Sequence, residues 1–265
     1  MRGNYKLANS EFPYLSLHTL NNQLAEAGAD TFTTMPAIRF SPAGWIMNLK
    51  GNKISYDPAA KKVKTLLSKE LAGKENAEES VAGFTAYLDK FNLYVSNPDK
   101  RINQVTTDGS KDIVYASSVH RDEFGISKGT FWSNKGTRLA FYRMDQGMVT
   151  DYPIIDWTER PAKADLIKYP MAGDKSHHVR VGVYNTETET TIWLKTGQPA
   201  DQYLTNIAWS PDDKYVFIAV LNREQKLLKL NQYDVSSGEF VKTLFEEKDE
   251  KYVEPLVPML FLKNN

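Results

Sequence analysis

The chain repeats one short pattern, in which an aromatic residue and a serine are followed by a polar turn and a run of strand-forming residues. The pattern occurs at Phe131–Phe141 and Ala208–Ile218, with a more divergent copy at Phe40–Ile46 and a fourth candidate at Val81–Tyr87. Each copy is followed by a second strand-forming unit that contains a tyrosine, at Ile54–Asp57, Leu93–Ser96, Gly182–Asn185 and Asn231–Asp234. A polar turn and another strand come next, so each repeat predicts four successive strands, the organisation of a β-propeller blade.

The rest of the sequence also favours strands over helices. Short runs of β-branched and aromatic residues are separated by Gly, Pro, Asn and Asp, as in Asp112–Ser118, Leu139–Arg143, Val179–Tyr184, Thr191–Leu194 and Tyr215–Leu221. The spacing of apolar residues predicts short helices only over Leu15–Ala27 and Val63–Leu71. We therefore predict an all-β chain that forms a partial β-propeller of about four to five four-stranded antiparallel blades.

The distance between the repeats predicts how the chain is organised along its length. The two clearest copies begin 77 residues apart, which exceeds the ~40–50 residues of a plain blade. We therefore expect an extended connection within residues 150–196, and we expect Tyr252–Phe261 to begin a further blade. An N-terminal segment with a short helix, residues 1–30, would precede the incomplete propeller of residues 31–265.

Composition excludes several classes of protein and site. The 265 residues carry 33 basic and 33 acidic side chains, so the net charge of zero gives no general attraction to nucleic acid. The chain has no cysteine, which excludes disulfides, thiolate nucleophiles and thiolate zinc sites. No apolar run reaches the ~18–20 residues of a membrane helix. The first residues also lack the apolar core of a signal peptide, so either the chain is not exported or a signal has been removed.

We predict no metal and no cofactor. His177 and His178 are adjacent on an expected strand, where successive side chains point to opposite faces, so the two imidazoles cannot bind one ion. We expect both histidines to be structural. The recurring aromatic residues are expected in the core of the blades: Trp132, Tyr184, Trp209 and Tyr233.

Six motifs follow one another along the second half of the chain: Val119–Ile126, Gly129–Ser133, Phe141–Asp145, Tyr169–Gly173, Ser176–Val179 and Tyr203–Asn206. The series resembles the N-terminal propeller of bacterial dipeptidyl peptidase IV and prolyl tripeptidyl peptidase, which are serine peptidases of the prolyl oligopeptidase type. The resemblance implies that this chain is the first half of an eight-bladed propeller. It also implies a periplasmic or exported protein whose catalytic Ser, Asp and His belong to a C-terminal hydrolase domain that this chain lacks.

The same resemblance implies a substrate-binding role for Asp122 and Glu123. They fall on the family's acidic pair, which projects from the propeller wall and binds the α-ammonium group of the peptide. Two carboxylates suit an ammonium group because its three N–H donors form charge-assisted hydrogen bonds. Without the resemblance, Arg121–Glu123 is typical of a solvated surface cluster, and this alternative stays open. Phe124 and Ile126 are expected to pin the pair onto the blade below.

A serine motif lies directly after the acidic pair. Gly125–Gly129 matches the G-x-S-x-G nucleophile elbow, which places an activated serine between a buried strand and a helix. Here charged residues precede the motif and Thr130–Trp132 begins a strand, so we predict a turn, with no catalytic residue. His120, which precedes the acidic pair, is expected to be a hydrogen-bonded neighbour of the pair.

The sequence thus predicts the substrate-gating and N-terminus-anchoring propeller portion of a serine exopeptidase, catalytically silent as an isolated chain. The alternative is a truncated propeller paralogue that acts as a protein- or peptide-binding module. The resemblance implies that the partner in the full-length family is the N-terminus of a peptide, with no nucleic acid. Terminal blades without neighbours would leave apolar faces uncovered, so self-association is also expected.

Overall fold

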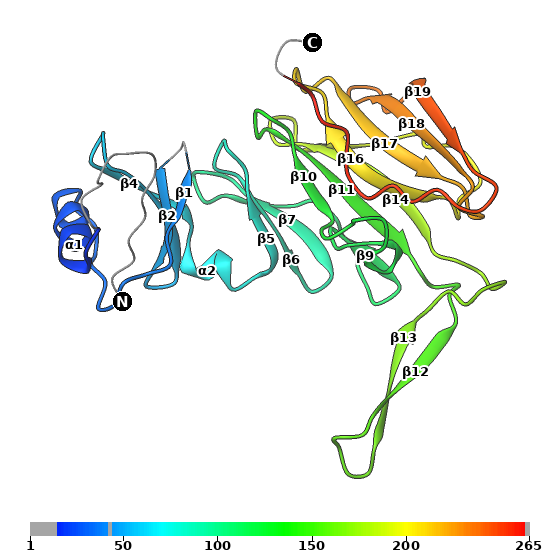
Figure 1. Ribbon diagram of the computed structural model, residues 1–265, viewed down its shortest axis with the longest axis horizontal. Coiled ribbons are helices and arrows are strands. Elements are labelled where there is room, and N and C mark those ends of the chain that lie inside the picture. The colour runs from blue at the N-terminus through cyan, green and yellow to red at the C-terminus, as the bar shows by residue number, and fades with distance from the viewer. Residues whose placement is uncertain (1–14, 42–43, 263–265) are drawn as a thin grey trace. The chain divides into compact units, whose positions relative to one another are not determined.

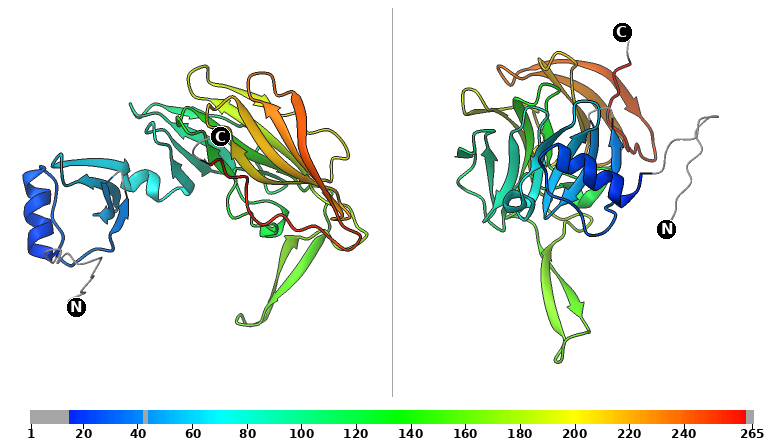
Figure 2. Two further views of the ribbon diagram at one scale, coloured as in Figure 1. Left: turned by 45° about the horizontal axis from the view of Figure 1, so that its top comes forward. Right: turned by 90° about the vertical axis from the view of Figure 1, so that its left-hand side faces the viewer.

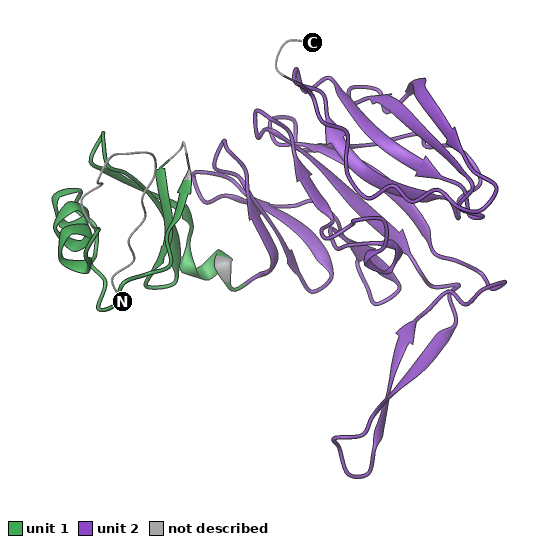
Figure 3. Cartoon of the chain, viewed as in Figure 1, with its two compact units in different colours: residues 1–73 green, residues 74–265 purple. Residues whose placement is uncertain are grey.

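The computed structural model describes residues 15–41 and 44–262, and it divides the chain into two compact units, residues 1–73 and residues 74–265 (Figure 3). Within the described ranges the strands form four antiparallel sheets of four or more strands and one separate two-stranded hairpin (Figure 1). The prediction of an all-β partial propeller is confirmed. In this part of the chain no helix is both long and apolar enough to span a membrane.

The first unit is one sheet with a helix packed against it. Its elements are α1 (Leu17–Glu26), β1 (Arg39–Ser41), β2 (Gly44–Leu49), β3 (Asn52–Asp57), β4 (Lys62–Leu67) and α2 (Lys69–Ala72). The helix α1 begins where the Ser16 hydroxyl accepts a hydrogen bond from the Thr19 amide at 3.0 Å, an N-cap that satisfies one of its free N–H groups. Leu20 and Leu24, one turn apart, are fully buried and pack against Met47 and other residues of the sheet.

The prediction of a helix over Val63–Leu71 is wrong for most of this segment. Val63 pairs with Tyr56 in an antiparallel ladder, so this segment forms the edge strand β4. Only α2 is helical, and it begins after Ser68, whose hydroxyl accepts a hydrogen bond from the Leu71 amide at 3.4 Å. The β-branched residues of the segment fit the sheet, and the capping serine starts a new element.

The second unit contains three successive sheets, and in the first and last of them each strand pairs with the next strand along the chain. The first sheet comprises β5 (Glu75–Glu79), β6 (Thr85–Asp89), β7 (Asn92–Ser96) and β8 (Ile102–Gln104). The next comprises β10 (Thr130–Trp132), β11 (Arg138–Asp145), β14 (His178–Asn185) and β15 (Thr190–Trp193), and the short β9 (Ile113–Tyr115) also pairs with β11. The last comprises β16 (Tyr203–Trp209), β17 (Tyr215–Leu221), β18 (Leu227–Asp234) and β19 (Phe240–Lys248).

Successive sheets of the second unit pack face to face, and the sequence repeat explains how. Trp132 and Trp209 occupy the same position in the two clearest copies of the repeat. The Trp132 indole N–H donates to the Glu78 carbonyl at 3.2 Å, and the Trp209 indole N–H donates to the Phe131 carbonyl at 2.9 Å. In both cases the acceptor belongs to the first strand of the preceding sheet. The repeated tryptophan therefore joins each sheet to the one before it, as stacked propeller blades require.

The long spacing between these repeats comes from a hairpin between β11 and β14. Its strands, β12 (Asp151–Asp156) and β13 (Lys163–Lys168), pair only with each other. The hairpin projects away from the sheets of its unit (Figures 1 and 2). The connection expected within residues 150–196 is therefore partly this arm, and its later part supplies the blade strands β14 and β15.

The prediction that Tyr252–Phe261 begins another blade is wrong within the described residues. This segment contains no strand. It instead runs across the last sheet, where Val253 is buried and its amide donates to the Gln225 carbonyl at 2.7 Å. Pro255 and Pro258 explain the difference, because neither can donate a hydrogen bond to a strand ladder.

Candidate functional site

The acidic pair lies on a short turn between β9 and β10. The turn has a single left-handed helical stretch at His120–Asp122, with φ values of 55° for His120, 59° for Arg121 and 63° for Asp122. None of the three is glycine, and an L-residue in this conformation costs about 1–2 kcal/mol. Such strain persists only where surrounding structure enforces it, and it is concentrated at functional sites.

The residues after the pair fix the turn to the core. Phe124 and Ile126 are buried, at 5% and 6% exposure, and the Phe124 ring lies 5.0 Å from the Tyr203 ring between centroids. Gly125 lies between them with φ of 71°, and a Cβ atom there would lie 2.1 Å from the Leu256 carbonyl oxygen. Only glycine fits this position. The buried residues leave the side chains of Asp122 and Glu123 exposed above the core.

Glu123 lines a cavity of about 670 Å³ that also includes residues of the 169–174 loop and of the turn between β17 and β18. Its walls carry four carboxylates and two guanidinium groups, so the cavity is acidic even though the chain is neutral: Glu123, Asp174, Asp201 and Glu224, with Arg121 and Arg223. Such a balance attracts a cationic group. Asp122 does not line the cavity; its carboxylate accepts a short hydrogen bond from the Ser118 hydroxyl.

Both guanidinium groups of the cavity already have aromatic partners. The Arg121 guanidinium lies 5.7 Å from the centre of the Tyr169 ring, and the Arg223 guanidinium lies 5.4 Å from the centre of the Tyr203 ring. Arg223 also donates a hydrogen bond to the Tyr203 hydroxyl. These contacts hold the arginines against the walls. Among the described residues, neither arginine forms a salt bridge with the Glu123 carboxylate.

A buried pair of imidazoles lies beneath the turn. His120 and His177 are 3% and 4% exposed, and His120 Nδ1 lies 2.8 Å from His177 Nε2. The Leu204 amide donates to His120 Nε2 at 3.1 Å. The expectation that His120 is hydrogen-bonded is correct, although its partners are these groups and not the acidic pair. His178, the first residue of β14, is exposed.

Burial sets the protonation of this pair. It lowers the pKa of His120 well below its usual value, with further contributions from His177 and Arg223. Burial likewise lowers the pKa of His177 to about 4, with smaller contributions from Arg223, His178 and Arg121. Both rings are therefore neutral at neutral pH.

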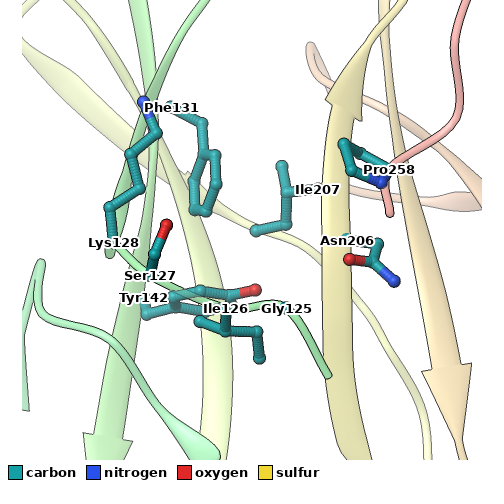
Figure 4. A pocket seen from close by; sticks show the side chains of 9 residues that line it. All are labelled: Gly125, Ile126, Ser127, Lys128, Phe131, Tyr142, Asn206, Ile207 and Pro258. Atoms are coloured by element: carbon teal, nitrogen blue, oxygen red, sulfur yellow. The ribbon is translucent and has the colours of Figure 1, made fainter. Parts of the chain in front are cut away.

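Ser127, the serine of the elbow motif, lies in a loop between the left-handed turn and β10. It lines a separate, mostly apolar cavity of about 320 Å³, next to Tyr142 and Ile207 (Figure 4). Among the described residues that line this cavity there is no histidine and no carboxylate that could act as a base. The nearby Tyr142 hydroxyl donates to the Leu204 carbonyl at 2.9 Å, and burial raises the pKa of Tyr142.

The described part of the chain has no group of three or more histidine, aspartate or glutamate side chains that could bind a metal ion. The walls of the acidic cavity contain residues that the sequence did not single out as a site. Tyr169 and Tyr203 belong to quoted motifs, but Asp201, Arg223 and Glu224 lie in or near turns with no distinguishing pattern. Only the fold brings them together.

A family model described as the dipeptidyl peptidase IV N-terminal region matches residues 43–265. The chain belongs to this family. Among solved structures, a protein described as a dipeptidyl aminopeptidase IV from Bacteroides ovatus is 41% identical, with a TM-score of 0.78, over 94% of this chain and 35% of that one. Dipeptidyl peptidase 4 from Porphyromonas gingivalis shares the fold at 24% identity, with a TM-score of 0.65, over 82% of this chain and 31% of that one.

Curated relatives also match part of this dipeptidyl peptidase IV family chain. The "probable dipeptidyl-aminopeptidase B" of Tuber melanosporum is 29% identical over 64% of this chain and 21% of its own length. The protein of the same name from Phaeosphaeria nodorum is 30% identical over 60% of this chain and 20% of its own length. The chain thus spans about a fifth of these relatives and about a third of the solved structures.

Proposed function

We propose that this chain is the part of a dipeptidyl-peptidase-IV-like serine exopeptidase that binds the free N-terminus of a peptide, with Glu123 as the direct ligand of the α-ammonium group. The observation that carries the proposal is the position of Glu123, an exposed carboxylate at the wall of an acidic cavity next to a strained turn. The family supplies the peptidase context, and hydrolysis itself is assigned to residues outside this chain.

The two acidic residues have different roles in this proposal. Glu123 faces the cavity and accepts hydrogen bonds from the ammonium group. Asp122 is turned to the Ser118 hydroxyl and contributes its charge from the edge of the site. A peptide without a free N-terminus has no cation to offer and loses this interaction. The site therefore selects for exopeptidase substrates.

The test is a titration of the chain with two peptides, Ala-Pro-amide and its N-acetyl form, followed by two-dimensional NMR. Because the cavity is open to water, we expect binding at about millimolar concentration, with about a tenfold preference for the free N-terminus, equivalent to one charge-assisted hydrogen bond. Glu123→Gln keeps the size of the side chain and removes its charge, and we expect the preference to fall below about threefold.

Glu250→Gln is the matched control, because Glu250 is exposed and does not line the cavity. It should keep the full preference for the free peptide. An equal effect of Glu123→Gln and Glu250→Gln would refute the assignment and favour the solvated surface cluster.

A further inference from the structure

The left-handed turn needs support from outside itself. Its backbone bonds are local: the Asp122 amide donates to the Val119 carbonyl at 3.1 Å, and the Glu123 amide donates to the His120 carbonyl at 3.2 Å. These bonds close the turn. They do not fix it against the sheets, and three successive non-glycine residues in this conformation are disfavoured.

His120 supplies hydrogen bonds from the turn to both neighbouring sheets. Its Nε2 accepts from the Leu204 amide on β16, and its Nδ1 contacts Nε2 of His177, which directly precedes β14. Because Nε2 of His120 is an acceptor, the ring proton lies on Nδ1, which donates to His177. The tautomer of His120 is thereby defined by the geometry.

The bond pattern requires both rings to be neutral. A proton on His120 Nε2 would face the Leu204 amide, and a proton on His177 Nε2 would face the His120 N–H, so either protonation breaks a hydrogen bond. The charged and titratable groups around the pair come from the turn itself, the 169–178 segment, the start of β16 and the β17–β18 turn: Arg121, Glu123, Asp174, His178, Asp201, Tyr203, Arg223 and Glu224.

We propose that His120 and His177 are positioning residues for the peptide site, because their hydrogen-bonded imidazoles fix the left-handed turn against β14 and β16 and so hold the Glu123 carboxylate at the cavity. Both residues also line the cavity, and both ring nitrogens of His120 are already hydrogen-bonded within the protein. The effect of this pair on peptide binding rests on the proposed function. The contact between His120 and His177, and its effect on the turn, can be measured without any peptide.

The first measurement is the ¹⁵N chemical shifts of the imidazole nitrogens in the labelled chain at pH 7. We expect His120 to carry its proton on Nδ1, with Nε2 unprotonated. A spectrum that shows His120 protonated on Nε2 would overturn the proposal, because that tautomer cannot accept from Leu204.

The second measurement compares three variants. His177→Gln keeps an acceptor at about the reach of Nε2, His177→Leu removes it, and His178→Leu alters the exposed neighbour as a control. We expect His177→Leu to shift the amide signals of Asp122 and Glu123 and to lower the preference for free over acetylated Ala-Pro-amide from about tenfold to below about threefold. His177→Gln and His178→Leu should stay within about twofold of the unmodified chain.

The outcomes separate this inference from the proposed function. If the unmodified chain shows no preference for the free peptide, the proposed function fails, and the amide shifts of Asp122 and Glu123 still decide whether the pair holds the turn. If His177→Leu and His177→Gln change these shifts equally, or neither changes them, the positioning role is refuted. Circular dichroism of each variant identifies one that has not folded, and the imidazole tautomer of the unmodified chain remains decisive in that case.

Discussion

Asp213 provides the sharpest test of how consecutive sheets are joined. It is 4% exposed and lies in the turn between β16 and β17, with φ of 61°. Its carboxylate accepts three hydrogen bonds from the equivalent turn of the preceding sheet: from the Asn134 amide at 2.8 Å, the Asn134 side chain at 2.7 Å and the Lys135 amide at 2.8 Å. Asp213→Ala removes all three of these hydrogen bonds, and the Asn134 side chain keeps only its bond to the Ser210 carbonyl, at 2.8 Å.

The cost follows from these contacts. Asn134 and Lys135 are solvated, so each lost hydrogen bond should cost about 1 kcal/mol of unfolding free energy, the low end of the ~1–3 kcal/mol for an unsatisfied group. The total cost is then about 3 kcal/mol. In a unit of this size that loss lowers Tm by about 6–12 °C. Asp212→Ala is the control, because Asp212 is exposed and bonds only within its own turn, and it should cost less than about 1 kcal/mol.

Thermal unfolding at pH 7 can be followed by tryptophan fluorescence, since the Trp209 indole lies at this junction. Asp213→Asn keeps one acceptor oxygen and tolerates the left-handed backbone, so its Tm should lie between those of the chain and Asp213→Ala. If the Tm values of Asp213→Ala and Asp212→Ala agree within about 2 °C, the turn-to-turn network does not hold the sheets together.

Three further outcomes are expected. Tyr142→Phe leaves the Leu204 carbonyl without its 2.9 Å donor, and urea denaturation should show a loss of about 1–2 kcal/mol; an unchanged midpoint would contradict the bond. The pKa of His177 falls from 6.5 in the unfolded chain to about 4 in the fold. The unfolded chain therefore binds the proton first, so the stabilisation is complete above pH 6.5 and about 3 kcal/mol is lost as the pH falls towards 4. Urea titrations of the chain and of His177→Gln should show a shallower decline for the variant, and parallel curves would contradict this assignment. Ser127→Ala should leave the rate of any Xaa-Pro nitroanilide cleavage unchanged. A loss of activity in this variant would indicate that Ser127 acts as a nucleophile.

The sheets could be predicted from the sequence because each repeat contains the strand-forming runs and polar turns of one sheet in a fixed order. Tyr184 and Tyr233, the tyrosines of the repeated unit, are 2% and 0% exposed, as the repeat predicts for core residues. Two predictions made from local pattern alone are wrong. The helix predicted over Val63–Leu71 is mostly a strand, because this segment pairs with β3. The strand predicted within Tyr252–Phe261 does not form, because prolines prevent a ladder.

The candidate site could be predicted only in part. The motif around Glu123 indicates this residue, but only the structure shows that Glu123 lines the cavity while Asp122 is turned to Ser118, the difference on which their proposed roles rest. The contact between His120 and His177 joins residues 57 apart in sequence. It depends on two sheets meeting, and no local spacing encodes it.

The most direct test of the central claim is kinetic. This chain would replace the matching third of the Bacteroides ovatus protein, and kcat/KM for Ala-Pro-p-nitroanilide would be measured for the hybrid and for its Glu123→Gln and Glu250→Gln variants. A site that holds the ammonium group predicts that Glu123→Gln lowers kcat/KM by about 10–100-fold, the equivalent of one charge-assisted hydrogen bond in a closed cavity, while Glu250→Gln has no effect. Equal kcat/KM values for the two variants, in an active hybrid, would show that Glu123 does not bind the peptide N-terminus.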